Sequence, residues 1–153
     1  MQAPIDHVLD GVYISGWRAT LFADELREAG IMNVLKLYED VPYFPDDFNL
    51  CDNPLEDGEP IPPGVLQHGV QFIWKQVNLG RPVLVMCGAG ISRSSTFVLA
   101  YLLERRYDLH GAYRMLKYCH PEARPHPCMW QALITNYQAP YTLQDVLAWM
   151  LEA

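Results

Sequence analysis

A short apolar run that leads through a glycine-containing turn into an apolar helix is the strongest constraint on how this chain folds. Residues 83–86, Val-Leu-Val-Met, have the pattern of a buried strand. Residues 92–106, which include STFVLAYLLERR, have a helical pattern that is apolar on most sides, as expected at the centre of a domain. The two elements therefore predict a core of strand and helix that meet at the intervening turn.

Strands and helices alternate along the rest of the chain. The Asp10-Gly11 pair predicts the turn of a strand hairpin within residues 7–15, and Gly30 predicts the end of a helix. Further strands are predicted at 31–38 and 49–51, and helices at 21–29, 62–80, 110–118, 126–137 and 142–153. We therefore expect an α/β fold whose central, mostly parallel sheet has four to five strands flanked by helices. Ligands bind at the carboxyl ends of strands in such sheets, and Cys87 lies at one.

The length of the chain allows one sizeable core and is too short for two ordinary domains. We therefore expect a single domain over residues 1–153. Thr142 and Asp145 have the spacing of a capping box, so residues 141–153 are expected to form a helix docked at its end. Of all residues, 50% are apolar and 19% are charged, which is typical of a folded protein.

Charge and hydropathy argue against several kinds of partner. The net charge is −7 and no run of Lys or Arg occurs, which disfavours nucleic-acid binding. The longest apolar run, 97–103, is too short to span a bilayer, and residues 1–11 lack the basic and apolar segments of a signal peptide. We therefore expect a cytoplasmic monomer that binds neither nucleic acid nor membrane.

The four cysteines do not indicate a disulfide framework in a chain without a secretion signal, so each is expected to be a free thiol. Cys119, His120, His126 and Cys128 cluster in the sequence, but their spacing fits no common zinc pattern. A proline-rich connection with incidental thiols is the preferred interpretation. We expect neither a metal nor another cofactor.

The turn after the central strand has the composition of an anion site. Gly88 and Gly90 let the backbone curl so that successive N–H groups point inward, and the helix that begins near Ser92 adds the positive end of its dipole. The same field stabilises a thiolate, which predicts that Cys87 is a nucleophile at neutral pH. A phosphate-sized cradle is therefore expected from Gly88, Ala89, Gly90, Ile91, Ser92 and Arg93.

Two further side chains complete a reactive set. Arg93, six residues after Cys87, can place a planar fork over the loop and bind two oxygens of a phosphoryl group as charge shifts in the transition state. Ser94 can hydrogen-bond the sulfur and make it a better leaving group. The alternative to a reactive site is that Cys87 is a buried structural cysteine before a tight turn and that Arg93 caps an unrelated group. The strand before the motif and the helix after it favour the reactive site.

The segment Met86–Ser94 resembles the HCxxGxxRS loop of the protein tyrosine phosphatase superfamily, and within it of the dual-specificity phosphatases. The likeness extends over about residues 6–140, through VLDGVYISGWRAT, LREAGIMNVLKLYED and PEARPHPCMWQALITNY. It implies hydrolysis of phosphotyrosine on proteins or peptides through a phosphocysteine, with phosphoserine and phosphothreonine as further candidates. The loop lacks the Lys and His of tensin-related phosphoinositide phosphatases, which favours a phosphoprotein. The arginine six residues after the cysteine also fits phosphatases better than rhodanese-type sulfurtransferases, whose loop usually closes one residue sooner.

The family supplies a proton donor from an aspartate about thirty residues before the cysteine. Asp57 lies thirty residues before Cys87 and is the expected general acid, and the base that then activates water. Glu56 and Asp52 are the alternatives, because alignments in loops shift by a residue. The remaining interpretation is that all three are solvated loop carboxylates.

Met86 departs from the family pattern, which has histidine there to order the loop and activate the thiol. Methionine offers only a weak acceptor sulfur, so we expect reduced activation with activity retained. Two other functions stay open: a phosphate-binding adaptor with a weakened loop, and a phosphatase of a non-protein substrate. Trp17 and Arg18 either flank the substrate pocket or lie solvated on the surface.

Overall fold

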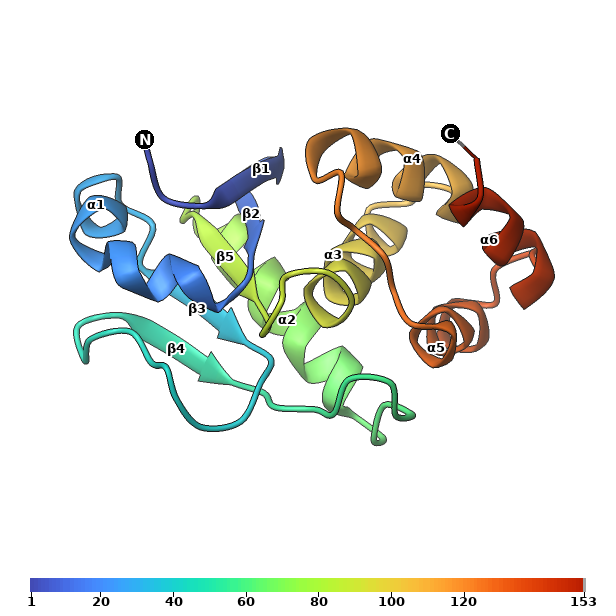
Figure 1. Cartoon of the computed structure of the whole chain (residues 1–153), viewed down its shortest axis with the longest axis horizontal. Helices are drawn as coiled ribbons and strands as arrows, with labels where there is room; N and C mark the ends of the chain where they lie inside the picture. The colour runs from blue at the N-terminus through green and yellow to red at the C-terminus, as the bar shows by residue number, and fades with distance from the viewer. Residues whose placement is uncertain (153) are drawn as a thin grey trace.

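The strands of the chain form one mixed sheet in the computed structural model, which describes residues 1–152 (Figure 1). They are β1 (Ile5–Leu9), β2 (Val12–Ser15), β3 (Asn33–Lys36), β4 (Asn49–Asp52) and β5 (Val83–Met86). Their order is β1-β2-β5-β3-β4; β1 is antiparallel to β2, and the other neighbours are parallel. The predicted α/β fold with a mostly parallel sheet of four to five strands is confirmed.

The helices follow the predicted periodicity with ends that differ by a few residues. They are η1 (Trp17–Phe22), α1 (Ala23–Glu28), α2 (Val65–Asn78), α3 (Arg93–Glu104), α4 (Leu109–Cys119), α5 (Pro127–Tyr137) and α6 (Leu143–Met150). The 3₁₀ helix η1 was not predicted, because it buries only Ala19 and so leaves no apolar period in the sequence. α3 ends before the predicted residue 106 because Arg106 has a left-handed backbone, with φ of 71°.

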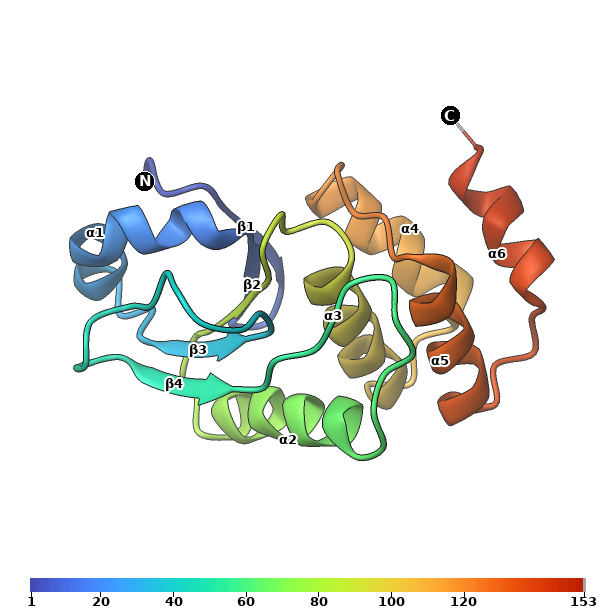
Figure 2. The same ribbon diagram turned by 60° about the horizontal axis from the view of Figure 1, so that its bottom comes forward.

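The central strand β5 is buried on both faces. Val83 and Val85 belong to a core shared with α2 and α3, whereas Leu84 and Met86 belong to a smaller core shared with η1 and α1. Figure 2 shows α1 and α2 on opposite sides of the sheet. Because successive side chains of a strand point to opposite faces, a strand covered on both sides reads as a continuous apolar run.

The remaining helices, α3 to α6, lie together on one side of the molecule, and α6 lies far from the sheet (Figure 1). α3 packs against the sheet and against α2, α4 and α5, and α6 packs against α5. Thr142 and Asp145 form the capping box at the start of α6, and Trp149 contacts Trp130 edge to face. Ala153, the last residue of the predicted terminal helix, lies outside the described residues. No helix within residues 1–152 is long and apolar enough to cross a membrane.

Candidate active site

The structure brings Cys87, Gly90 and Ser94 together at the carboxyl end of β5, where the chain turns into α3. The sulfur of Cys87 lies 3.2 Å from Ser94 Oγ, and the Gly90 N–H donates to it at 3.2 Å. Cys87 is only 1% exposed. We call residues 87–93 the cysteine loop. Its sulfur is therefore held between a backbone donor and a hydroxyl at the base of the loop.

Backbone contacts with the start of η1 fix the shape of the cysteine loop. Gly90 has φ of 76°, and a Cβ there would lie 2.5 Å from the backbone nitrogen of Gly16. A Cβ at Gly16 would lie 2.8 Å from the carbonyl oxygen of Gly88, and the Trp17 N–H donates to that same oxygen at 2.9 Å. Glycine is therefore required at positions 16 and 90, because the backbones of the two segments lie directly against each other and leave no room for a Cβ.

The guanidinium of Arg93 lies under the loop and connects it to two other segments. Its Nη1 donates to the carbonyl oxygens of Leu37, at 3.4 Å, and Leu55, at 3.1 Å. Its Nε is buried and has no hydrogen-bond partner among residues 1–152. A Cβ on Gly88 would lie 3.0 Å from Nη2, so this nitrogen faces the loop. The Nε and Nη2 edge of the guanidinium thus has no hydrogen-bond partner in the part of the chain that the structure describes.

The amino-terminal end of α3 meets the cysteine loop at Ser92. The first turn of α3 contains no acidic residue, so no side chain of that turn offsets the positive end of the helix dipole. Ser92 Oγ accepts the backbone N–H of His126 at 2.9 Å, and Thr96 Oγ1 donates to the Ser92 carbonyl oxygen at 2.8 Å. These contacts join the loop, α3 and the start of α5.

The three candidate acids have different surroundings. Asp57 and Glu56 are exposed in the turn that follows Leu55, the residue whose carbonyl oxygen binds Arg93. Asp52 already has partners, since its carboxylate lies 3.6 Å from Lys36 Nζ and accepts from the hydroxyl of Tyr43 at 3.3 Å. Asp57 and Glu56 are therefore the carboxylates that are free to meet a substrate.

The turn that carries Asp57 rests on the start of α5. Gly58 has φ of 80°, and a Cβ there would lie 3.4 Å from the ring of His126. The thiol of Cys128 donates to the Glu59 carbonyl oxygen at 3.3 Å. Arg93 on one side and α5 on the other thus hold the turn beside the cysteine loop.

Lys36 was not predicted to take part in the site and is fully buried at the carboxyl end of β3, in register with Met86 of β5. Its Nζ donates to the Tyr38 carbonyl oxygen at 2.7 Å and lies 4.2 and 4.1 Å from the ring centres of Tyr38 and Tyr43. Burial, and then the neighbouring Cys87, raise the pKa of Tyr38 to about 12. Its phenol therefore stays protonated near neutral pH.

His120 also reaches the cysteine loop, although the sequence placed it only in a cluster of possible metal ligands. Its Nε2 lies 2.5 Å from the Gly90 carbonyl oxygen and its Nδ1 lies 2.6 Å from Asp6 Oδ2. His126 instead lies 3.3 Å from the sulfur of Cys128. Neither His120 contact could be predicted from the sequence, because the partners lie 30 and 114 residues away.

All four cysteines lie in the described part of the chain and carry free thiols. Burial raises the pKa of the Cys51 and Cys128 thiols above the ordinary value of 9.0. A raised pKa keeps a thiol protonated at neutral pH, and the protonated form is a poor nucleophile. Cys51 and Cys128 are therefore less readily ionised than an ordinary thiol.

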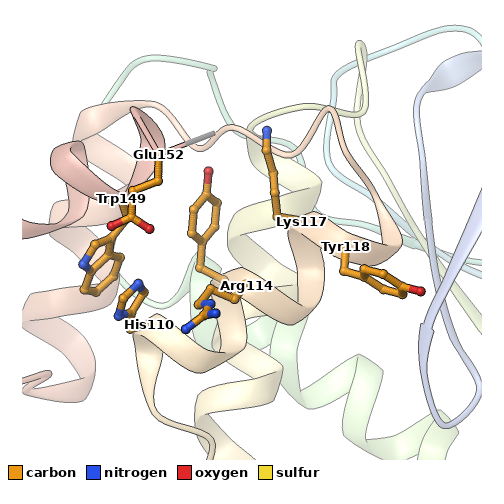
Figure 3. Close-up of a pocket in the computed structure, with 7 residues that line it drawn as sticks. His110, Arg114, Lys117, Tyr118, Trp149 and Glu152 are labelled. Atoms are coloured by element: carbon orange, nitrogen blue, oxygen red, sulfur yellow. The ribbon is translucent and has the colours of Figure 1, made fainter.

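A cavity of about 400 Å³ opens beside the cysteine loop, and its lining includes Trp17, Arg18, Gly88 and Ala89. The structure thus brings Trp17 and Arg18 next to the loop. A second cavity, of about 320 Å³, lies between α4 and α6 and is lined by His110, Arg114, Lys117 and Trp149 among others (Figure 3). No residue of the cysteine loop lines it, so the second cavity is not part of this site.

Known proteins of similar sequence and fold identify the family. The family model for the catalytic domain of dual specificity phosphatases matches residues 12–139. Human dual specificity protein phosphatase 12 is 35% identical over 124 residues, which are 76% of this chain and 36% of that protein. A Dictyostelium discoideum MAP kinase phosphatase with leucine-rich repeats is 29% identical over 92% of this chain and 17% of its own length.

The chain therefore spans about a third or less of these two relatives. Among solved structures, DUSP15 superposes with a TM-score of 0.79 at 26% identity and covers 94% of both chains. Human DUSP28 superposes with a TM-score of 0.75 at 25% identity, over 90% of this chain and 94% of that one. With its cysteine loop at the carboxyl end of β5, this chain belongs to the dual specificity phosphatase catalytic-domain family.

Proposed function

We propose that this chain is a cysteine-dependent phosphatase that hydrolyses phosphomonoesters on proteins through a phosphocysteine intermediate. The observation that carries the proposal is a sulfur held 3.2 Å from both an N–H and a hydroxyl, beside an arginine whose buried Nε has no protein partner among residues 1–152. Structural cysteines do not need such surroundings. A nucleophile that receives and releases a phosphoryl group does.

In the first step the thiolate of Cys87 attacks phosphorus, an S–P bond forms and the bond to the substrate oxygen breaks. The free edge of Arg93 binds two phosphoryl oxygens, and the amides of the cysteine loop bind the others. Asp57 gives its proton to the leaving oxygen. The products of this step are the dephosphorylated side chain and phosphocysteine.

In the second step water attacks the phosphorus of the phosphocysteine. The Asp57 carboxylate, now without its proton, accepts one from the water, and the S–P bond breaks. Ser94 Oγ, 3.2 Å from the sulfur, donates a hydrogen bond to the thiolate as it leaves. Inorganic phosphate is released and Asp57 is protonated again. No metal or cofactor enters either step.

Phosphotyrosine on proteins is the proposed substrate, with phosphoserine and phosphothreonine as further substrates. Peptides of one sequence that carry phosphotyrosine, phosphoserine or phosphothreonine are expected to release inorganic phosphate, measured with a colorimetric phosphate assay. Phosphoinositides and nucleotides tested at the same concentration serve as the comparison. Release from these compounds and from none of the peptides would overturn the protein substrate.

Replacement of Asp57 with asparagine is expected to lower kcat about 100-fold for phenyl phosphate, whose leaving oxygen needs a proton. The same variant is expected to lose only a few-fold with nitrophenyl phosphate, since nitrophenolate leaves without one. Glu56→Gln is the matched control, because Glu56 is the exposed neighbour in the same turn. A larger loss in Glu56→Gln than in Asp57→Asn would assign the acid to Glu56.

The four free thiols support a reducing compartment for this chemistry. A thiolate nucleophile is lost on oxidation, so it must stay reduced to act. We therefore place the proposed activity in the cytoplasm.

A further inference from the structure

A histidine from outside the cysteine loop binds the middle of that loop. His120 follows α4 and is 2% exposed. Its Nε2 lies 2.5 Å from the carbonyl oxygen of Gly90, the residue whose N–H donates to the sulfur of Cys87. On the other side of the ring, Nδ1 lies 2.6 Å from Asp6 Oδ2 and 3.3 Å from Glu122 Oε1. A chain of contacts thus runs from β1 through His120 to the sulfur.

The partners of the ring fix its orientation. A carbonyl oxygen has no hydrogen to give, so Nε2 must donate to Gly90. Asp6 and Glu122, one from β1 and one from the segment after α4, place carboxyl groups beside Nδ1 on the other side of the ring. The ring is therefore held between a loop carbonyl and two acidic side chains.

The same segment also holds the next carbonyl of the cysteine loop. The backbone N–H of Arg124 donates to the carbonyl oxygen of Ile91 at 2.9 Å. The carbonyls of residues 90 and 91 are therefore both turned toward residues 120–124. In a trans peptide the N–H points opposite to the C=O. The N–H groups of Ile91 and Ser92 are consequently turned away from that segment, toward the inside of the loop where an oxyanion would bind.

We propose that His120 is a positioning residue that fixes the peptide after Gly90 with its N–H turned inward, with Asp6 and Glu122 holding the ring. The effect on catalysis rests on the proposed phosphatase function, whereas the effect on oxyanion binding does not. Met86 stands where the HCxxGxxRS pattern has a histidine that orders the loop. His120, which lies 30 residues after Gly90, supplies a histidine contact to this loop from outside it.

Inorganic phosphate binding and steady-state kinetics test this role. We expect His120→Leu to raise the Kd for inorganic phosphate about tenfold, the loss expected for one hydrogen bond, and to lower kcat by a similar factor. His120→Gln is expected to stay within about threefold of the unchanged protein, since its amide can still donate to Gly90. His7→Gln, a change of the histidine beside Asp6 on β1, is the control. EDTA in every assay excludes a cation bound by Asp6, His120 and Glu122.

Equal losses of phosphate affinity in the Leu and Gln variants would overturn the role, as would a lower melting temperature in His120→Leu with Kd and kcat unchanged. Asp6→Asn tests the same role if His120→Leu does not fold, because Asp6 is 39% exposed in its side chain. That variant is expected to raise Kd about threefold, since an amide holds the ring less strongly than a carboxyl group does. An unchanged Kd would contradict the proposal. If the unchanged protein binds phosphate but hydrolyses nothing, the proposed function fails while the Kd values still decide the role of His120.

Discussion

Serine in place of Cys87 is expected to abolish hydrolysis of aryl phosphates and phosphopeptides, with a loss of at least about 10⁴-fold in kcat. The physical reason is that a hydroxyl stays protonated in a field that stabilises a thiolate, so no nucleophile forms. The edge of Arg93 that faces the cysteine loop remains in place to bind phosphate. The Cys87→Ser variant is therefore expected to bind inorganic phosphate and release none from substrate.

Cys51→Ser is the matched control, because Cys51 is a free thiol on β4 whose pKa is raised by burial. Initial rates with nitrophenyl phosphate and a phosphotyrosine peptide, measured side by side for the three proteins, give the comparison. If the unchanged protein and Cys87→Ser are equally inactive while both bind a phosphopeptide, the chain is a phosphate-binding adaptor. In that case Met86 would mark a loop that has lost catalysis.

Lysine in place of Arg93 is expected to lower kcat about 1000-fold or more while the fold is retained. Lysine keeps the positive charge but has a single ammonium group, so it cannot bind two phosphoryl oxygens with parallel N–H groups. Loss of comparable transition-state donors costs about 10² to 10⁵ in rate. Arg93 Nη1 also donates to the carbonyl oxygens of Leu37 and Leu55, so the turn before Asp57 is expected to loosen in the variant.

The pattern of kcat and KM separates the two roles of Arg93. A fork that binds mainly the transition state predicts that kcat and kcat/KM fall together. Arg114→Lys, a change on α4 in the cavity remote from the cysteine loop, is the control and should not alter either constant. A rise in KM with kcat preserved would limit Arg93 to ground-state binding and contradict the mechanism.

The sequence predicted the elements that depend on local chemistry. β5 was located at its observed bounds because it is buried on both faces, and the Asp10-Gly11 turn and the capping box of Thr142 and Asp145 follow from short-range rules. The 3₁₀ helix η1 was not predicted, because it buries a single residue. The period of apolar residues shows which face of an element is buried. An element with one buried residue has no such period.

The predictable part of the site lies in and directly after the cysteine loop, together with Trp17 and Arg18, which were expected either beside the pocket or on the surface. The contact between Cys87 and Ser94 and the placement of Arg93 involve residues that follow one another in the strand–turn–helix unit. Lys36 between two tyrosine rings and His120 between Gly90 and Asp6 could not be foreseen, because each contact joins segments that only the tertiary fold brings together. A buried lysine in an apolar strand was visible in the sequence, but its partners were not.

Identification of the phosphorylated residue during turnover is the most direct test of the mechanism. The protein is mixed with nitrophenyl phosphate, quenched in acid within one turnover and digested, and its peptides are analysed by mass spectrometry. The account predicts one phosphoryl group on the sulfur of Cys87, and none in the Cys87→Ser protein treated in the same way. Turnover of the substrate without a phosphoryl group on Cys87, or with one on another residue, would contradict it.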